Sequence, residues 1–134
     1  MAYDVISADG HIDLIWLPPD LFTSQASGQM KERMPYVTEG ENGPKWVSKN
    51  GSEFGLMNGM GSAGREYIPG QIARSDRMAE TGLYDDGKKG IRRLTDPALR
   101  IKDQERDGVR GEVLYGILGA SQRLNDPEAA AEMM

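Results

Sequence analysis

One apolar run near the C-terminal end of the chain constrains the fold more than any other feature. Residues 112–118 read Glu-Val-Leu-Tyr-Gly-Ile-Leu and lie between Gly111 and Gly119. A short apolar run between glycines is typical of a parallel strand that is buried on both faces. The sequence therefore predicts an α/β fold with a parallel sheet.

The first sixteen residues predict a second buried strand. Val5 and Ile6 begin an apolar segment that becomes polar over residues 7–13. Pro18 and Pro19 then stop any regular element, because consecutive prolines remove two backbone donors and fix two φ angles. We expect a strand with a polar C-terminal end within residues 1–16.

Residues 96–134 predict a helix, the apolar strand and the start of another helix. Asp96 is a good N-cap, Pro97 suits the first helical position and Gly108 is a good stop, so the first helix should span Pro97–Asp107. Asp126 as N-cap and Pro127 at the first helical position likewise predict the start of a second helix. No stop signal follows it before Met134, which favours a chain that is the front part of a longer protein.

Residues 17–95 resemble an insertion between these blocks. Asn50-Gly51 predicts a two-residue hairpin near 46–54, in which Val47 faces Phe54. A short helix is expected over Gln25–Met34.

Residues 55–95 are rich in glycine and are expected to be a long loop. Such a loop is functional, ordered by a neighbour, or mobile. Residues 59–64 fit the G-x-G-x-x-G pattern, but no apolar strand precedes them, so dinucleotide binding is not predicted.

Composition excludes several classes of protein. The 134 residues contain no cysteine and one histidine, and 16 basic against 21 acidic residues give a net charge of −5. Disulfide scaffolds and zinc-cysteine sites are excluded, and a cytoplasmic location is expected. The negative charge argues against nucleic acid as a partner, and no membrane-spanning segment or signal peptide is recognisable.

The solitary histidine lies in a motif with two carboxylates. Asp9, His11 and Asp13 have i, i+2, i+4 spacing, so on an extended segment all three side chains point to one face. A carboxylate beside an imidazole can chelate a divalent cation, with a third carboxylate as ligand or as outer partner. A turn at Asp9-Gly10 with a hydrogen-bonded histidine is the alternative.

Four segments together resemble the N-terminal portion of the amidohydrolase-related family of metal-dependent hydrolases and decarboxylases. They are residues 7–13 (Ser-Ala-Asp-Gly-His-Ile-Asp), 18–22 (Pro-Pro-Asp-Leu-Phe), 96–109 and 112–115. The resemblance implies a (β/α)8 barrel, of which this chain holds an incomplete N-terminal part with a long loop and hairpin insertion. Such a fragment exposes unpaired strand edges, so homo-oligomers are a further expectation.

The family pattern implies that Asp9 and His11 contribute the first ligands to one divalent metal ion. Many members carry histidine where this chain has Asp13, which makes Asp13 a further candidate ligand or outer partner. The additional oxygen shifts the balance from Zn²⁺ toward Mn²⁺ or Mg²⁺. The remaining ligands and the general acid or base would come from later strands, so no catalytic residue is assigned.

The resemblance implies an enzyme that hydrolyses, or removes CO2 from, a small carboxylic acid of aromatic or unsaturated type. The 134-residue chain alone is expected to show little activity. Two alternatives remain, a non-catalytic binding module and an inactive remnant of the same fold. The basic residues between Lys88 and Arg93 are expected to belong to a solvated loop.

Overall fold

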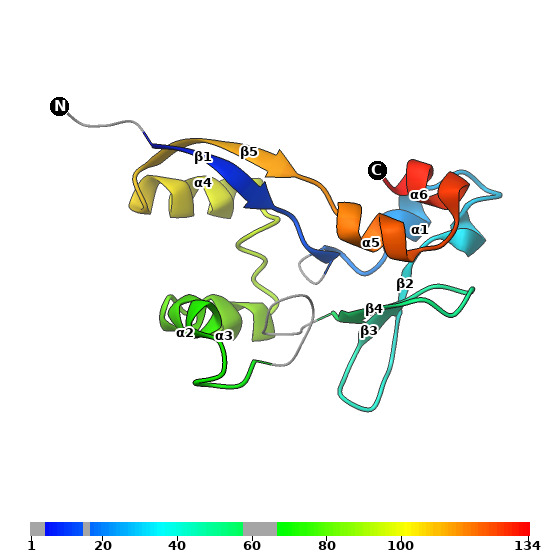
Figure 1. Ribbon diagram of the computed structural model, residues 1–134, viewed down its shortest axis with the longest axis horizontal. Coiled ribbons are helices and arrows are strands. Elements are labelled where there is room, and N and C mark those ends of the chain that lie inside the picture. The colour runs from blue at the N-terminus through cyan, green and yellow to red at the C-terminus, as the bar shows by residue number, and fades with distance from the viewer. Residues whose placement is uncertain (1–4, 15–16, 58–66) are drawn as a thin grey trace.

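The computed structural model describes residues 5–14, 17–57 and 67–134 and has a mixed α/β fold (Figure 1). Strands and helices are interspersed along the chain. In order they are β1 (Val5–His11), α1 (Leu21–Gln25), the 3₁₀ helix η2 (Lys31–Arg33), β2 (Tyr36–Thr38), β3 (Lys45–Val47), β4 (Glu53–Leu56), α2 (Ala73–Glu80), α3 (Leu83–Lys88), α4 (Pro97–Arg106), β5 (Val109–Tyr115), α5 (Leu118–Arg123) and α6 (Pro127–Met133).

The first and last strands form a two-stranded parallel sheet. Val5 pairs with Val109 at one end, and His11 pairs with Tyr115 at the other. The Ile12 amide donates to the Tyr115 carbonyl at 3.1 Å and continues the pairing past the end of β1. Helix α4 packs against β5. The two predicted parallel strands, and the predicted helix that precedes the second of them, are therefore confirmed.

The burial predicted for these strands is wrong. Ile6, Val113 and Tyr115 are 69%, 46% and 51% exposed, and β5 ends at Tyr115 rather than at residue 118. Both strands of a two-stranded sheet are edge strands, so neither has neighbours on both sides. The described residues contain no closed barrel, but a small parallel sheet and a small antiparallel one.

Two helices begin where their caps predict. The side chain of Asp96 accepts a hydrogen bond from the Leu99 amide at 3.0 Å, and Asp126 accepts one from the Ala129 amide at 3.1 Å. Each carboxylate satisfies an amide that has no partner within the first helical turn. Gly108, with φ at +69°, follows the end of α4.

The second sheet is antiparallel and has the order β2-β3-β4. The predicted hairpin is present, but Val47 pairs with Glu53 and not with Phe54, while Trp46 pairs with Gly55. The amide of Gly51 donates to Ser48, and that glycine has φ at +89°. This is the geometry of a three-residue loop, and it shifts the register by one residue at Val47. An irregularity between Trp46 and Val47 then restores the pairing that the two-residue loop predicts, with Trp46 opposite Gly55 and Lys45 opposite Leu56.

Two other expectations for the central segment are wrong. In place of the helix expected over Gln25–Met34, α1 ends at Gln25 and the short 3₁₀ helix η2 follows at Lys31–Arg33. The loop expected over residues 55–95 contains α2 and α3, which pack together. The glycine motif at 59–64 lies outside the described residues.

The main hydrophobic core lies away from the parallel sheet. It is formed by α1, the antiparallel sheet, α5 and α6, which Figure 1 shows on the opposite side of the molecule from α4. Its most buried large side chains include Trp46, Met34 and Leu124. A smaller cluster around Leu83 and Tyr84 joins α3 to its neighbours. Neither cluster includes a described residue of β1, α4 or β5.

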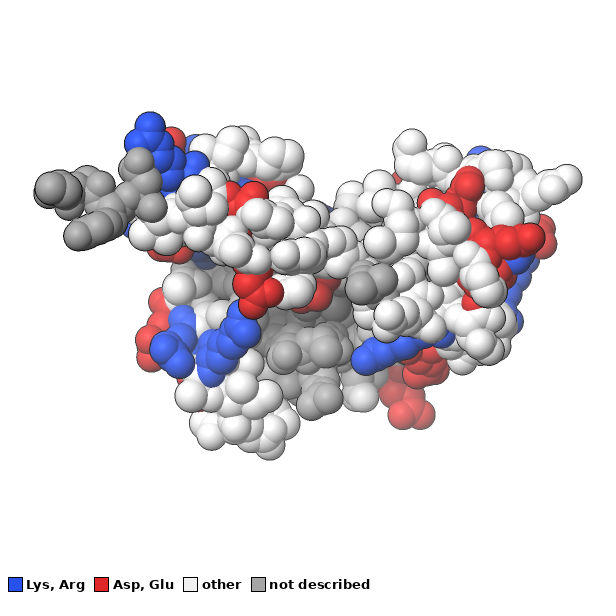
Figure 2. All heavy atoms as spheres, turned by 45° about the horizontal axis from the view of Figure 1, so that its top comes forward, with Lys and Arg blue, Asp and Glu red and all other residues white. Residues whose placement is uncertain are grey.

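Charged side chains of both signs lie on the described surface. Acidic and basic side chains are interspersed on the face shown in Figure 2, without a broad basic area among the described residues there. None of the helices in the described parts of the chain has the length and apolar character needed to cross a membrane.

Candidate functional site

The carboxyl-terminal end of β1 carries an exposed carboxylate and imidazole in direct contact. Oδ1 of Asp9 lies 2.9 Å from Nε2 of His11. Their side chains share one face because strand side chains alternate with period two. The Asp9 and His11 side chains are 88% and 54% exposed, so both are open to solvent.

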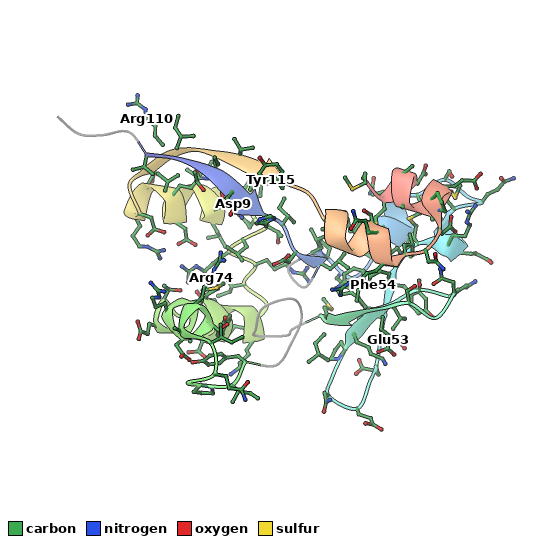
Figure 3. The ribbon with its side chains drawn as sticks, viewed as in Figure 1. Asp9, Glu53, Phe54, Arg74, Arg110 and Tyr115 are labelled. Atoms are coloured by element: carbon green, nitrogen blue, oxygen red, sulfur yellow. The ribbon has the colours of Figure 1, made fainter. Side chains whose placement is uncertain are left out.

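The neighbouring strand adds an aromatic ring to this pair. Tyr115 is the register partner of His11, and the two ring centroids lie 5.9 Å apart with an interplanar angle of 36°. Asp9 and Tyr115 are labelled together near the ends of β1 and β5 in Figure 3. The parallel arrangement therefore places polar and aromatic groups from two distant segments at one edge.

Gly10, which lies between Asp9 and His11 in β1, lies against the carboxylate of Glu112 in β5. A Cβ atom at Gly10 would lie 2.2 Å from Oε1 of Glu112, so only glycine leaves room for that carboxylate. Glu112 accepts hydrogen bonds from Arg100 and Gln104 of α4. The hydrogen bonds from Arg100 lower the pKa of Glu112 below its usual range. This carboxylate is committed to holding α4 on the sheet.

A cavity of about 320 Å³ adjoins His11 where β1 and β5 end. Its lining combines backbone, apolar side chains and three ionisable groups. The lining residues are His11, Ile12, Asp13, Leu14, Phe54, Gly116, Ile117, Gly119, Ala120 and Arg123. Phe54 comes from β4, which contacts α5 (Figure 3). Ligands of α/β proteins commonly bind at the carboxyl ends of parallel strands.

Asp13 lies beyond the end of β1 and is not part of the contact between Asp9 and His11. It is exposed and lines the cavity instead. Within residues 5–14, 17–57 and 67–134, no group of three or more histidine, aspartate or glutamate side chains is placed to hold a metal ion. The structure thus brings together two of the three residues of the sequence motif.

The geometry of Asp9 and His11 fits two neighbouring ligands of one divalent ion. Two ligand atoms that are each about 2.1 Å from an ion lie about 3.0 Å apart at the octahedral angle and about 3.4 Å apart at the tetrahedral angle of most zinc sites. The observed separation of 2.9 Å matches the octahedral spacing and is also that of an N–H···O hydrogen bond. A carboxylate oxygen and an imidazole nitrogen are ligands that Zn²⁺ and Mn²⁺ both accept.

Two residues of the site have no signal in the sequence motif. Tyr115 could have been found from its position at the end of the predicted parallel strand. Arg123 belongs to α5, which follows β5, and it lines the cavity. No periodic pattern in the sequence marks that position.

Comparison with known protein families, curated proteins and solved structures found no significant match to this chain.

Proposed function

We propose that the chain belongs to a metal-dependent hydrolase or decarboxylase of the amidohydrolase-related type, in which Asp9 and His11 supply the first ligands of one divalent ion. The observation that supports it is the contact of 2.9 Å between the two donor atoms, at the carboxyl end of a parallel strand and beside a cavity. Zn²⁺ or Mn²⁺ is the proposed ion, with Mg²⁺ as a weaker candidate.

The proposed architecture is a (β/α)8 barrel in which β1, α4 and β5 form the first strand, a helix and the second strand. The order and the parallel pairing support this assignment. Exposed Ile6 and Val113 support it as well, since barrel strands pair on both edges and pack on both faces. The segment between β1 and α4 would then be an insertion that shares its core with α5 and α6.

The proposed roles of the residues follow from their donor atoms. Asp9 would bind the ion through carboxylate oxygen and offset its charge, while His11 would bind through Nε2. When bound, the ion would polarise a carboxylate, phenol or carbonyl of the substrate, or activate a water molecule. The proposed reaction is hydrolysis, or loss of CO2 from a small aromatic or unsaturated carboxylic acid.

A second candidate is a metal-free binding module. The direct contact of Asp9 with His11 favours it, because a hydrogen bond between them satisfies both groups without an ion. Only the first candidate requires a divalent metal ion, so a measurement of metal binding distinguishes the two.

The test is titration of the intact protein with Mn²⁺, followed by electron paramagnetic resonance, with Zn²⁺ competition. We expect one site per chain, and His11→Ala and Asp9→Ala should each weaken it by more than about tenfold, since loss of even an outer partner of a ligand commonly has that effect. Asp20→Asn, an exposed carboxylate away from β1, is the control. Equal Mn²⁺ affinity in wild type and His11→Ala would exclude the metal centre.

A further inference from the structure

We propose that Asn42 is a site of spontaneous deamidation in the folded chain, and that the fold protects Asn50 from the same reaction. Each of these asparagines precedes a glycine, Gly43 or Gly51. Asparagine is among the thermolabile residues, and a glycine after it has no side chain to hinder ring closure. The two dipeptides therefore have the same reactive groups but different surroundings.

Deamidation at such a dipeptide needs only water as a co-reactant. The backbone nitrogen of the glycine loses its proton and attacks Cγ of the asparagine, so a new N–Cγ bond forms. The Cγ–Nδ2 bond breaks, and the side-chain nitrogen takes up a proton and leaves as ammonia. Water then opens the resulting succinimide at one of its two carbonyls and gives aspartate or isoaspartate. The asparagine side chain must therefore be free to turn its Cγ toward the next backbone nitrogen.

The backbones of the two turns are alike. The amide of Gly43 donates to the Gly40 carbonyl at 3.1 Å, and the amide of Gly51 donates to the Ser48 carbonyl at 3.0 Å. Both glycines have positive φ, at +108° and +89°. The attacking nitrogen is thus held in a similar way in each turn, so the asparagine side chains decide the difference in rate.

Three hydrogen bonds hold the side chain of Asn50. Its Nδ2 donates to the Leu124 carbonyl, and its Oδ1 accepts from the Ser48 hydroxyl and from the Ser52 amide. Leu124 is fully buried in the main core, so this contact joins the turn to the end of α5. Attack on Cγ of Asn50 requires these hydrogen bonds to break in a local opening of the turn.

The side chain of Asn42 is exposed in the loop between β2 and β3. None of the residues that the structure describes forms a hydrogen bond with it. Figure 1 shows this loop extending from the antiparallel sheet, away from α5 and α6. Asn42 lines an open hollow there, together with Glu39 and Glu41. Its Cγ can therefore reach the Gly43 nitrogen without loss of a side-chain contact.

The products of the two reactions differ in their effect on the fold. A carboxylate in place of the Asn50 amide would face the Leu124 carbonyl, to which Nδ2 now donates, and two acceptors repel each other. The product at Asn42 adds a negative charge beside Glu39 and Glu41, where the surface is open to solvent. Deamidation of the folded chain thus gives a more acidic form that keeps its stability.

The test follows deamidation of the intact protein in mildly alkaline buffer, with and without urea, by peptide mapping and fragment-ion mass spectrometry. The fragment ions locate the exchange of NH2 for OH at residue 42, 50 or 58, of which residue 58 lies outside the described part of the chain. In the folded protein residue 42 should react at least about tenfold faster than residue 50, the scale of one or two hydrogen bonds that must break first. In urea the two rates should converge.

Ser48→Ala tests the protection of Asn50 directly. It removes the hydroxyl that donates to Oδ1 of Asn50 but keeps the backbone hydrogen bonds of the turn. Reaction at residue 50 should become about two- to tenfold faster, and reaction at residue 42 should not change. Ser24→Ala is the matched control, because that hydroxyl donates only within α1, to the Leu21 carbonyl. It should change neither rate.

Stability measurements test the consequences of each product. Asn50→Asp should lower the urea midpoint, whereas Asn42→Asp should unfold at the wild-type midpoint. Equal rates at the two residues in the folded protein, a faster rate at residue 50, or a difference that persists in urea would overturn the proposal. An unchanged rate at residue 50 in Ser48→Ala would show that the hydrogen bonds do not protect Asn50 and would overturn it as well.

Discussion

Arg100 of α4 donates two hydrogen bonds to Glu112 of β5, from Nε at 2.8 Å and from Nη2 at 2.6 Å. The two side chains are only 14% and 12% exposed. Arg100 also donates to the carbonyl of Leu94 at 2.7 Å, and Gln104 donates to the same glutamate. The parallel sheet lies outside the main core, and this bidentate pair links the helix to the strand.

Replacement of Glu112 by Gln should lower the free energy of unfolding by about 1.5–3 kcal/mol near neutral pH, the scale of hydrogen bonds to charged groups. The hydrogen bonds from Arg100 lower the pKa of Glu112, so the unfolded chain binds this proton more readily than the folded chain. The contribution of ionised Glu112 to the free energy of unfolding is complete at a pH above the usual glutamate pKa of 4.5. This contribution is lost as the pH falls through the lower pKa that Glu112 has in the folded chain.

Urea unfolding of wild type and Glu112→Gln from about pH 7 to about pH 3 measures this dependence. The stability difference between them should shrink toward the acid end. Glu105→Gln, an exposed position on the same helix, should show little difference at any pH. A difference for Glu112→Gln that is constant with pH would contradict the assignment of the pair.

Gly10→Ala should destabilise the chain by about 1–3 kcal/mol, the usual range for overpacking. The new Cβ would meet Oε1, Cδ and Cγ of Glu112 at 2.2, 2.7 and 2.8 Å, and that side chain is held by Arg100 and Gln104. Gly111→Ala is the matched control in β5, because a Cβ there meets nothing within 4 Å.

A double-mutant cycle distinguishes a clash with Glu112 from a general effect on the strand. In a Glu112→Ala background the cost of Gly10→Ala should fall to that of Gly111→Ala. Strict additivity of the two substitutions in thermal or urea unfolding would show that Glu112 is not the obstacle.

The features that depend on local chemistry could be predicted from the sequence. Asp96 and Asp126 begin helices because a carboxylate accepts from an amide three residues on, whatever the surroundings. Period two alone places Asp9 and His11 on one face of β1, where the structure has them 2.9 Å apart.

The features that depend on distant neighbours could not be predicted. Burial of β5 requires elements on both sides of it, and in the described residues it has one strand and one helix. Asn50-Gly51 suits both a two-residue and a three-residue loop, so the register of Phe54 follows from packing in the core. Helices α2 and α3 could not be predicted because few apolar residues mark them. Arg93 joins this region to α4, since it donates hydrogen bonds to Asp86, Asp103 and the Thr81 carbonyl.

Trp46→Ala should destabilise the chain by about 3–5 kcal/mol, and Trp46→Phe by less than half as much. Trp46 is fully buried and packs edge-on against Phe22, with ring centroids 5.7 Å apart. Its Nε1 has no hydrogen-bond partner among the described residues, so phenylalanine removes a costly donor while keeping an aromatic ring. Urea unfolding of both variants checks that Trp46→Ala loses more stability than Trp46→Phe. An equal loss in both variants would mean that the indole N–H is satisfied.

Asp9→Asn should weaken Mn²⁺ binding to the chain more than Asp13→Asn, if the proposed metal centre is correct. Oδ1 of Asp9 lies 2.9 Å from Nε2 of His11, whereas Asp13 lies past the end of β1. Asparagine keeps the shape of each side chain and removes the charge, so loss of a direct ligand should cost more than about tenfold in affinity and loss of a nearby charge less. Titration with Mn²⁺ at two ionic strengths separates the two effects, because only the long-range contribution of Asp13 is screened by salt. A larger loss for Asp13→Asn would make Asp13 the direct ligand and Asp9 a hydrogen-bond partner of His11.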